Sequence, residues 1–293
     1  MKWGITGAGG QLGVELSLML HTLGYPTQTW SRQDLNVTDE SSVEVVMNSK
    51  PDVIVNCAAW TDVDGAETQE DRAFDVNQRG AALIAKAAKE LQIPLIQIST
   101  DYVFSGIGSR PFGISDPTVP ATAYGRSKLA GEREVLSIYP ERSYILRTAW
   151  LYGQHGGNFP STIIKKLLKS DEILKVVDDQ FGQPTWTKDL ASQIVELLEN
   201  QVPFGIYHAT NSGQASWFEF SQHILSLMNE SSNRVVPIST SAYPGLAPRP
   251  SYSVLDHSQW SGTNISPMRN WKNAFNEAFP EILESVKAKI NHG

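Results

Sequence analysis

Hydrophobic residues in the first half of the chain gather in short runs separated by longer stretches. Five short runs rich in strand-forming residues predict strands, at 2–6, 26–30, 53–57, 95–99 and 144–150; those at 53–57 and 95–99 are the apolar runs typical of strands buried on both faces. Three stretches between them favour helices through an apolar stripe at helical spacing or a high content of Ala and Lys, at 12–23, 72–91 and 123–138. Strands alternating with helices in this way predict an α/β fold with a doubly wound parallel sheet.

This alternation stops after about residue 153. The remaining chain predicts one strand at 205–209 and helices at 159–169, 189–199, 216–228 and 271–290. The stretch 239–250 is rich in Pro and Gly but carries bulky residues, which favours an ordered loop over a flexible linker. We therefore expect a first domain over 1–153, to which a strand and helix near 186–212 return, and a smaller, discontinuous domain made mainly of 154–293.

The composition is that of an ordinary globular chain. Of its 293 residues, 41% are hydrophobic and 19% are charged, and the formal net charge is −7 with no dense basic tract. A negative chain without a basic patch disfavours nucleic acid and anionic membrane as partners. The first strand pattern begins at residue 2 and no apolar run reaches membrane-spanning length, so we expect a cytoplasmic protein without a signal peptide.

Cysteine and histidine offer no metal site. Cys57 is the only cysteine, which rules out an intrachain disulfide, and its apolar surroundings favour a small buried side chain. The six histidines are scattered, and none combines with cysteine at zinc-ligand spacing. The sequence therefore predicts no metal ligands.

A glycine-rich loop lies between the first predicted strand and the first predicted helix. Gly7, Gly10 and Gly13 stand three residues apart in it. Glycines at this place permit a tight turn, let the backbone approach a pyrophosphate at the helix N-terminus, and allow close packing of helix on sheet. The loop predicts a dinucleotide-binding domain over 1–153.

The end of the second predicted strand favours a phosphorylated ribose. Ser31 and Arg32 stand there, and no carboxylate occurs before Asp34. A free ribose hydroxyl is usually bound by Asp or Glu, whereas an Arg accommodates a 2′-phosphate. Ser31 and Arg32 therefore favour NADPH, or acceptance of NADH as well; the alternative is that Arg32 is a solvated surface residue. Asp39 follows and is a candidate for the adenine side.

Tyr124 and Lys128 form the candidate catalytic pair. Four residues apart on a helix, they share one face, and a nearby ammonium is expected to lower the pKa of a tyrosine. Such a tyrosine can pass a proton at neutral pH. Thr100 stands at the carboxyl end of the strand at 95–99, where ligands bind in an open parallel sheet, and would hydrogen-bond a substrate oxygen. Together the three residues predict a carbonyl reductase in which Lys128 also contacts the nicotinamide ribose.

With these residues in place, the chain resembles the extended short-chain dehydrogenase/reductase superfamily and, within it, the dTDP-4-dehydrorhamnose reductase family. The resemblance covers nearly the whole chain. It rests on eight segments, at 6–13, 56–59, 75–77, 99–104, 124–128, 147–153, 179–185 and 249–250, of which the last two are specific to this reductase family. It implies a Rossmann-type sheet with a smaller, discontinuous C-terminal cap, formed mainly by 154–293, that binds the substrate.

The resemblance also implies roles for residues around the cofactor. Gln11 and Leu12 would line the pyrophosphate together with Gly10, and Ala58 and Ala59 would lie on the nicotinamide side. Asn77 would support the backbone of the active site. Some members of the superfamily use Mg²⁺ to bridge subunits through carboxylates; the sequence assigns no such ligands and leaves a homodimer open.

For the substrate, the resemblance implies contacts from four places in the chain. Thr100 and Asp101 would meet a 4-keto sugar, and Trp150 would pack on its ring, the alternative being a core aromatic residue. Gln183 and Arg249 would face the nucleotide part, because an Arg fork matches phosphate oxygens; the alternative for Arg249 is a surface residue in a proline loop.

The function that the resemblance implies is NAD(P)H-dependent reduction of the 4-keto group of a dTDP-4-dehydro-6-deoxyhexose, in first place dTDP-4-dehydro-L-rhamnose. Related dehydratases usually carry Glu where this chain has Tyr102, and related epimerases are usually longer. Tyr252 replaces an Asn common in relatives, which bears on the substrate more than on the chemistry. The alternatives are a sister ketoreductase of another deoxysugar and a non-catalytic regulatory subunit; the complete set of Thr100, Tyr124 and Lys128 argues against the second.

Overall fold

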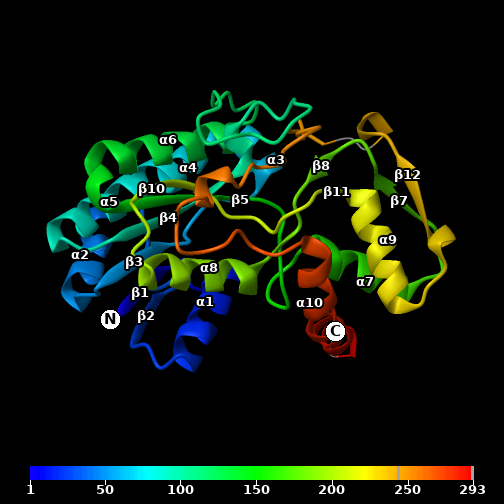
Figure 1. Ribbon diagram of the computed structural model, residues 1–293, viewed down its shortest axis with the longest axis horizontal. Coiled ribbons are helices and arrows are strands. Elements are labelled where there is room, and N and C mark those ends of the chain that lie inside the picture. Colours follow the sequence, from blue (N-terminus) through cyan, green and yellow to red (C-terminus); the bar gives the residue numbers. More distant parts are fainter. Residues whose placement is uncertain (243–244, 292–293) are drawn as a thin grey trace.

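The computed structural model describes residues 1–242 and 245–291, so two residues of the loop predicted over 239–250 lie outside the described residues. Its central layer is a six-stranded parallel sheet of order β10-β5-β4-β3-β1-β2 (Figure 1). The strands are β1 (Trp3–Thr6), β2 (Thr27–Trp30), β3 (Val53–Asn56), β4 (Leu95–Thr100), β5 (Ser143–Thr148) and β10 (Gly205–His208). The chain order reverses between β1 and β3, where the carboxyl ends of neighbouring strands diverge and leave room for a ligand.

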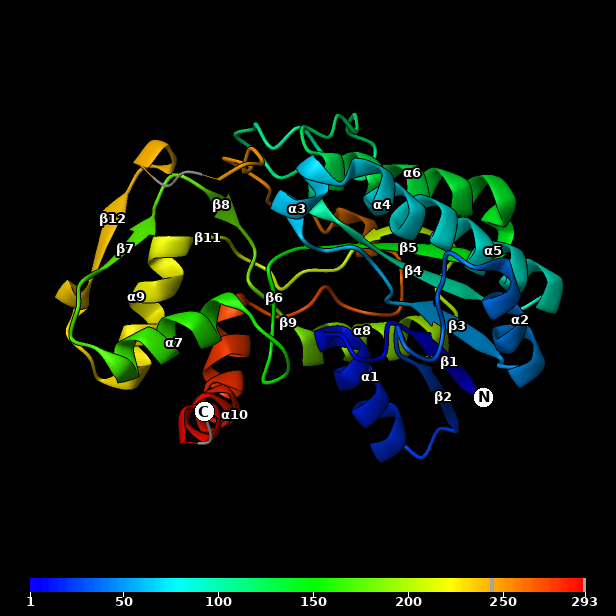
Figure 2. The same cartoon turned by 180° about the vertical axis from the view of Figure 1, so that it is seen from behind.

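Helices cover both faces of the sheet (Figures 1 and 2). On one face lie α1 (Gln11–Thr22) and α8 (Thr187–Glu199), and on the other α5 (Gly80–Leu91) and α6 (Ala123–Ile138). Successive residues of β3 point to opposite faces: Val55 packs with Leu16 and Leu190, whereas Ile54 packs with Ile84. All of β3 is therefore buried and its first three residues are apolar, as predicted for a strand covered on both sides, and the expected doubly wound α/β fold is confirmed.

Three helical segments differ from the sequence-based expectation, and one of them, the short helix α3 (Val63–Thr68), has no predicted counterpart. The pattern does not predict α2 (Glu40–Ser49), which lacks a clear apolar stripe; Val43 and Val46 are buried in the core beside α5, so tertiary packing decides this helix. The single helix predicted over 72–91 is interrupted. A π-helical turn, Asp75–Arg79, separates α4 (Glu70–Phe74) from α5.

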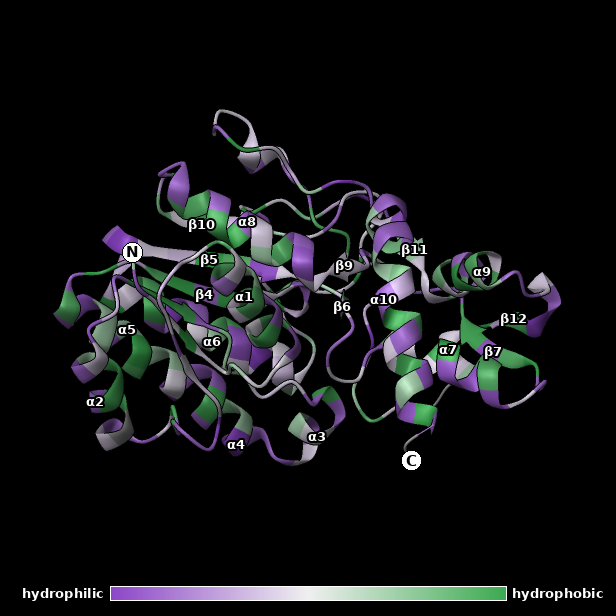
Figure 3. Ribbon diagram, turned by 90° about the horizontal axis from the view of Figure 1, so that it is seen from below, coloured by the Kyte–Doolittle hydropathy of each residue, from purple (hydrophilic) through white to green (hydrophobic). Residues whose placement is uncertain are grey.

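A second group of elements lies beside the sheet and has its own apolar core (Figures 1 and 3). It contains the helices α7 (Phe159–Lys169), α9 (Trp217–Met228) and α10 (Trp271–Asn291) and the parallel pair β7 (Leu174–Val177) and β12 (Val235–Ile238). Two short pairs complete it, β8 (Phe181–Gly182) with β11 (Ala215–Ser216) and β6 (Leu151–Tyr152) with β9 (Thr185–Trp186). None of the described helices is long and apolar enough to cross a membrane.

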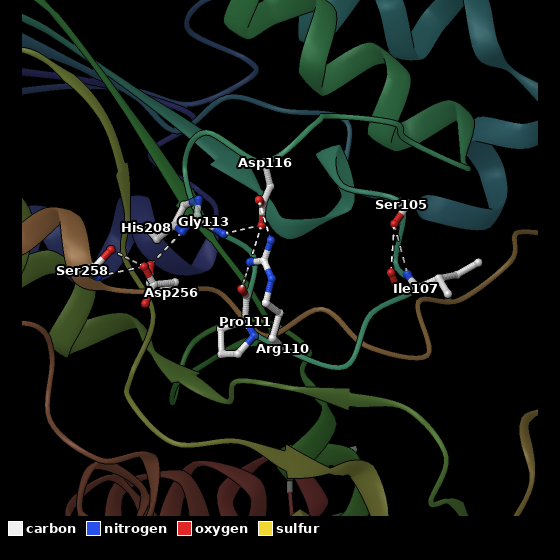
Figure 4. A network of polar contacts seen from close by, with 9 residues as sticks. All are labelled: Ser105, Ile107, Arg110, Pro111, Gly113, Asp116, His208, Asp256 and Ser258. Carbon is white, nitrogen blue, oxygen red and sulfur yellow. Dashed lines mark hydrogen bonds and ion pairs between the residues drawn. The ribbon is translucent and has the colours of Figure 1, made fainter.

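The segment between β4 and α6 folds against the chain that precedes α10. The Phe112 N–H donates to a backbone carbonyl of that chain segment, and the Phe112 carbonyl accepts from Asp256 N–H at 2.8 Å. Arg110 and Asp116 form a two-bonded ion pair with both N–O distances 2.9 Å, and His208 Nδ1 bonds the Asp256 carbonyl at 2.8 Å (Figure 4). This network holds in place the segment that leads from Thr100 to Tyr124.

Candidate active site

A cavity of about 1420 Å³ opens at the carboxyl ends of β1, β3, β4 and β5. It brings together most of the residues predicted for the site, although they come from distant parts of the chain. The predicted residues that line it are Gly7, Gly10, Gln11, Leu12, Gly13, Ser31, Arg32, Ala58, Ala59, Thr100, Asp101, Tyr124, Lys128 and Trp150.

Asp39 and Gln183 do not line this cavity. The Asp39 carboxylate caps α2 by accepting from Ser41 N–H at 3.0 Å. Gln183 is buried, and its Oε1 accepts from Leu255 N–H at 2.8 Å and from the Thr210 hydroxyl at 2.9 Å. The structure thus uses both side chains to hold local backbone, and their binding roles stay predictions.

Arg249 also lies outside the cavity lining. Its Nη2 is 2.6 Å from Asp64 Oδ2 of α3 (Val63–Thr68), and Ala247 N–H donates to Asp64 Oδ1 at 2.9 Å. The hydrogen bond from Ala247 and the charge of Arg249 lower the pKa of Asp64. This ion pair fastens the loop that carries Arg249 to α3, and a role in binding the nucleotide stays a prediction.

The glycine loop forms a cradle that only glycine can build. Gly7 has φ +64°, and a Cβ added to it would lie 2.6 Å from Ala58 N. A Cβ on Gly13 would lie 2.5 Å from the Gly7 carbonyl oxygen. The N-cap of α1 is Gly10, no side chain caps this helix end, and its first turn holds no acidic residue. Backbone N–H groups and the positive end of the α1 dipole therefore face the cavity, which fits a dinucleotide pyrophosphate.

The residues at the end of β2 suit a phosphorylated ribose. The Ser31 hydroxyl donates to Asp34 Oδ2 at 2.6 Å, and this bond lowers the pKa of Asp34. Arg32 is exposed at the rim of the cavity. A cation at this position can pair with a 2′-phosphate, as expected for NADPH.

Tyr124 and Lys128 lie in the first turns of α6. Thr122 caps this helix by accepting from Gly125 N–H, which places both side chains at the cavity. Lys128 is 4% exposed, and its Nζ donates to the Ile98 carbonyl at 2.6 Å. Burial lowers the pKa of Lys128 to about 8, while the carboxylate of Glu132 opposes this shift.

The expectation that Lys128 lowers the pKa of Tyr124 is wrong for this structure. Burial raises the pKa of Tyr124 to about 12, and only hydrogen bonding with Thr100 opposes the rise. The Lys128 ammonium is bonded to the Ile98 carbonyl instead. The Tyr124 phenol is therefore fully protonated at neutral pH, which is the state that a proton donor needs.

Thr100 and Asp101 form a hydrogen-bonded pair at the end of β4. Thr100 Oγ1 donates to Asp101 Oδ1 at 2.9 Å, while Oδ2 of this buried carboxylate has no partner in the described structure. Burial raises the pKa of Asp101 to about 6. The pair presents polar atoms to the cavity beside Tyr124, where a sugar oxygen can take them as partners.

Asn77 ties the cavity wall to α6 from within the π-helical turn. Its Oδ1 accepts from Trp60 N–H at 2.9 Å, and its Nδ2 donates to Ser127 Oγ at 2.9 Å. Ser127 in turn donates to the Tyr124 carbonyl at 2.8 Å. The turn that the sequence pattern misses thus places a side chain that braces the helix of the catalytic pair.

Trp150 is held between two neighbours. Its backbone has φ +47°, which ends the strand predicted over 144–150. Its ring stacks on Trp217 with 3.4 Å between centroids and 4° between planes. On Gly182 a Cβ would lie only 2.4 Å from Trp150 Cε2, so Gly182 also approaches the ring closely. One face of the indole is therefore covered by Trp217, and flat packing of a sugar on that face requires Trp217 to move.

Three residues near the site, Glu132, Arg147 and Trp217, have no role predicted from the sequence. Glu132 and Arg147 form a buried ion pair behind the catalytic residues. The sequence does contain a signal for the ion pair. Arg147 is a charged residue within an apolar strand, and Glu132 is a carboxylate one helical turn after Lys128. Trp217 carries no such signal, since it lies far along the chain from Trp150. Among the described residues, no group of three or more His, Cys, Asp or Glu side chains is arranged to hold a metal ion.

Comparison with known proteins identifies the family. The family model described as RmlD substrate binding domain matches residues 1–284. A dTDP-4-dehydrorhamnose reductase from Streptomyces griseus is 44% identical over 286 residues, which cover 96% of this chain and 94% of the relative. A dTDP-4-keto-6-deoxy-D-glucose reductase from Streptomyces niveus is 42% identical, with 95% of this chain and 96% of the relative covered.

Solved structures are similar over the same length. A dTDP-4-dehydrorhamnose reductase from Bacillus anthracis, solved in complex with NADP, has a TM-score of 0.91 and 37% identity over 96% of this chain and 99% of its own. A dTDP-4-dehydrorhamnose reductase from Clostridium acetobutylicum has a TM-score of 0.89 and 40% identity over 96% of this chain and 99% of its own. The chain therefore belongs to the RmlD substrate binding domain family, the family of the dTDP-4-dehydrorhamnose reductases.

Proposed function

We propose that this chain reduces the 4-keto group of a dTDP-4-dehydro-6-deoxyhexose, dTDP-4-dehydro-L-rhamnose in first place, with NADPH as the reductant. The observation that carries the proposal is the convergence of Thr100, Tyr124 and Lys128 on one cavity that also contains the glycine cradle. The product, a dTDP-activated deoxysugar, is a building block for polysaccharide synthesis. Arg32 at the end of β2 supports NADPH over NADH.

The roles of the side chains follow from their positions. When bound, NADPH supplies the hydride that adds to carbon 4 of the sugar. Tyr124 donates its hydroxyl proton to the oxygen of the reduced carbonyl. The Thr100 hydroxyl would turn its one proton from Asp101 Oδ1 to this oxygen, and a single donor to a developing oxyanion contributes about 3–4 kcal/mol. Lys128 lines the same cavity, with its ammonium held by the Ile98 carbonyl, and would bind the nicotinamide ribose.

Product analysis tests the proposal and identifies the sugar. The relatives named for dTDP-4-dehydrorhamnose and for dTDP-4-keto-6-deoxy-D-glucose are 44% and 42% identical to this chain, so identity does not separate the two substrates. We would supply a panel of dTDP-4-keto-6-deoxyhexoses with NADPH and assign the configuration at carbon 4 of each product by NMR. Oxidation of NADPH with formation of dTDP-L-rhamnose is expected. Another deoxysugar product would identify a sister ketoreductase, and NADPH binding without any turnover would refute the proposal.

The Trp150 stack offers a separate test of substrate positioning. In Gly182→Ala the new methyl group would collide with Trp150, so the indole must shift at the edge of the cavity. We expect the KM for the sugar to rise about ten-fold, the equivalent of about 1.4 kcal/mol, with little change in the KM for NADPH.

Gly113→Ala is the matched control for that variant. A Cβ on Gly113 would have its nearest neighbour, Asp116 Oδ2, at 3.9 Å, and this residue does not line the cavity. Its kinetic constants should equal those of the wild type. An unchanged KM for the sugar in Gly182→Ala would contradict a role of Trp150 in holding the substrate.

A further inference from the structure

A buried ion pair lies directly behind the catalytic residues. Glu132 of α6 and Arg147 of β5 have side chains that are 1% and 3% exposed, and Arg147 Nη2 is 2.7 Å from Glu132 Oε2. Glu132 Oε1 accepts a second bond from Arg147 Nε at 2.9 Å and a third from the Ser99 hydroxyl at 2.5 Å. Three donors from two strands thus fix this carboxylate in a single orientation.

Burying such a pair is costly, and apolar side chains of similar volume usually stabilise a core as well or better. A contribution to stability therefore does not explain why the ion pair is buried at this place. The position of the ion pair indicates a role in the active site. Ser99 is next to Thr100 on β4, Arg147 is the register partner of Ser99 on β5, and Glu132 follows Lys128 by one turn of α6. Through its bond from Ser99, Glu132 thus ties α6 to β4, the two elements that carry the catalytic residues.

The charges around Lys128 also indicate that Glu132 has a role at the active site. Cys57 after β3 and Glu132 on α6 act on its charge, Asp101 after β4 and Tyr124 on α6 line the same cavity, and Arg147 on β5 is paired with Glu132. At neutral pH Cys57 and Tyr124 are neutral, because burial raises the pKa of each to about 12. Glu132 is the carboxylate that raises the pKa of Lys128 against the effect of burial. Its fixed orientation keeps this negative charge one turn from the ammonium.

We propose that Glu132 is a positioning residue for the reaction: held by Arg147 and Ser99, its carboxylate supports the Lys128 ammonium one helical turn away and ties α6, which carries Lys128, to β4, which carries Thr100. The inference rests on the proposed function for its kinetic part only. A buried structural pair would affect stability alone, whereas a positioning residue also affects the titration of Lys128. The two interpretations therefore differ in a measurable way.

The test uses the double variant Glu132→Gln/Arg147→Met. A single Glu132→Gln change would leave an unpaired buried guanidinium and endanger folding, whereas the double variant removes both charges together. Lys128 is followed by NMR of ¹³C-labelled lysine Cε, with its resonance assigned by Lys128→Met. We expect its titration midpoint to fall by about one pH unit.

Kinetics provide the second readout. A lysine is charged below its pKa, so activity that needs the Lys128 cation falls as pH rises through this value. In the wild type the fall in kcat/KM for NADPH is expected near the Lys128 pKa of about 8. In the double variant the same fall should begin about one pH unit lower. Asp189→Asn/Arg269→Met, which removes a two-bonded ion pair outside the cavity, is the control and should leave the pH profile unmoved.

The outcomes separate the inference from the proposed function. A folded double variant in which Lys128 titrates as in the wild type overturns the role of Glu132, even when stability or activity has dropped. A shifted Lys128 titration in a protein that reduces none of the dTDP-keto sugars refutes the proposed reaction and retains the electrostatic part of the inference. A shift in both the NMR titration and the pH profile supports both.

Discussion

Replacing Tyr124 by phenylalanine is expected to lower kcat for the keto sugar by about 10²–10⁴-fold. The phenol is the proton donor of the proposed reaction, and burial keeps it protonated, with a pKa of about 12. Phenylalanine preserves the ring, including its edge contact with Tyr102, whose centroid is 5.5 Å away. NADPH affinity, measured by fluorescence titration, should therefore remain close to that of the wild type.

Tyr144→Phe is the control for loss of a buried hydroxyl. The Tyr144 hydroxyl donates to the Val202 carbonyl at 2.5 Å and lies outside the cavity lining, so its removal should lower stability slightly and leave kcat unchanged. Single-turnover oxidation of NADPH measures the chemical step in both variants. Wild-type kcat in Tyr124→Phe would exclude this residue as the donor and with it the proposed mechanism.

Gly7→Ala is expected to abolish measurable NADPH binding and to destabilise the fold by at least about 2 kcal/mol. At φ +64° an alanine is strained, and its Cβ would lie 2.6 Å from Ala58 N. The collision is with backbone, which no side-chain rotation relieves. The neighbouring strands must separate at the point where the cofactor is proposed to bind. Chemical denaturation and cofactor titration measure the two effects.

Gly24→Ala separates collision from backbone strain. Gly24 also has a positive φ, +78°, but a Cβ there would meet nothing within 4 Å, and the residue is outside the cavity lining. We expect it to cost about 1 kcal/mol in unfolding free energy and to leave NADPH affinity intact. If both variants lost the same unfolding free energy and the same NADPH affinity, backbone strain alone would explain the losses. The close approach of β1 and β3 would then have no role in cofactor binding.

The sequence predicts those parts of the fold that depend on local pattern. Short strand-forming runs predict the strands of the sheet, and helical spacing or composition predicts helices α1, α6 and α7. These elements occur within a few residues of the expected positions. Helix α2 and the π-helical turn at Asp75–Arg79 depend on neighbours that are distant in sequence, so no local pattern predicts them. The pairing of β7 with β12, which lie more than 50 residues apart, also cannot be predicted from a local sequence pattern.

The candidate site shows the same division. Glycine spacing and the Tyr124/Lys128 spacing identify the cofactor cradle and the catalytic pair, because a turn and a helix bring near neighbours together. Asp39, Gln183 and Arg249 carry suitable chemistry, but the fold places them outside the cavity. A residue type predicts what a side chain can bind, whereas its position depends on packing that spans the whole chain.

By itself, the sequence therefore determined the α/β architecture, the glycine cradle and the identity of the reactive side chains, since each is specified within a few neighbouring residues. Only the tertiary structure decided how these side chains behave. Burial raises the pKa of Tyr124 to about 12 and lowers that of Lys128 to about 8, so the expected lowering of the Tyr124 pKa by Lys128 does not occur. The stack of Trp217 on Trp150 and the pair of Glu132 with Arg147 join residues 67 and 15 positions apart. Desolvation and long-range contact exist only once the chain has folded, and no local pattern contains them.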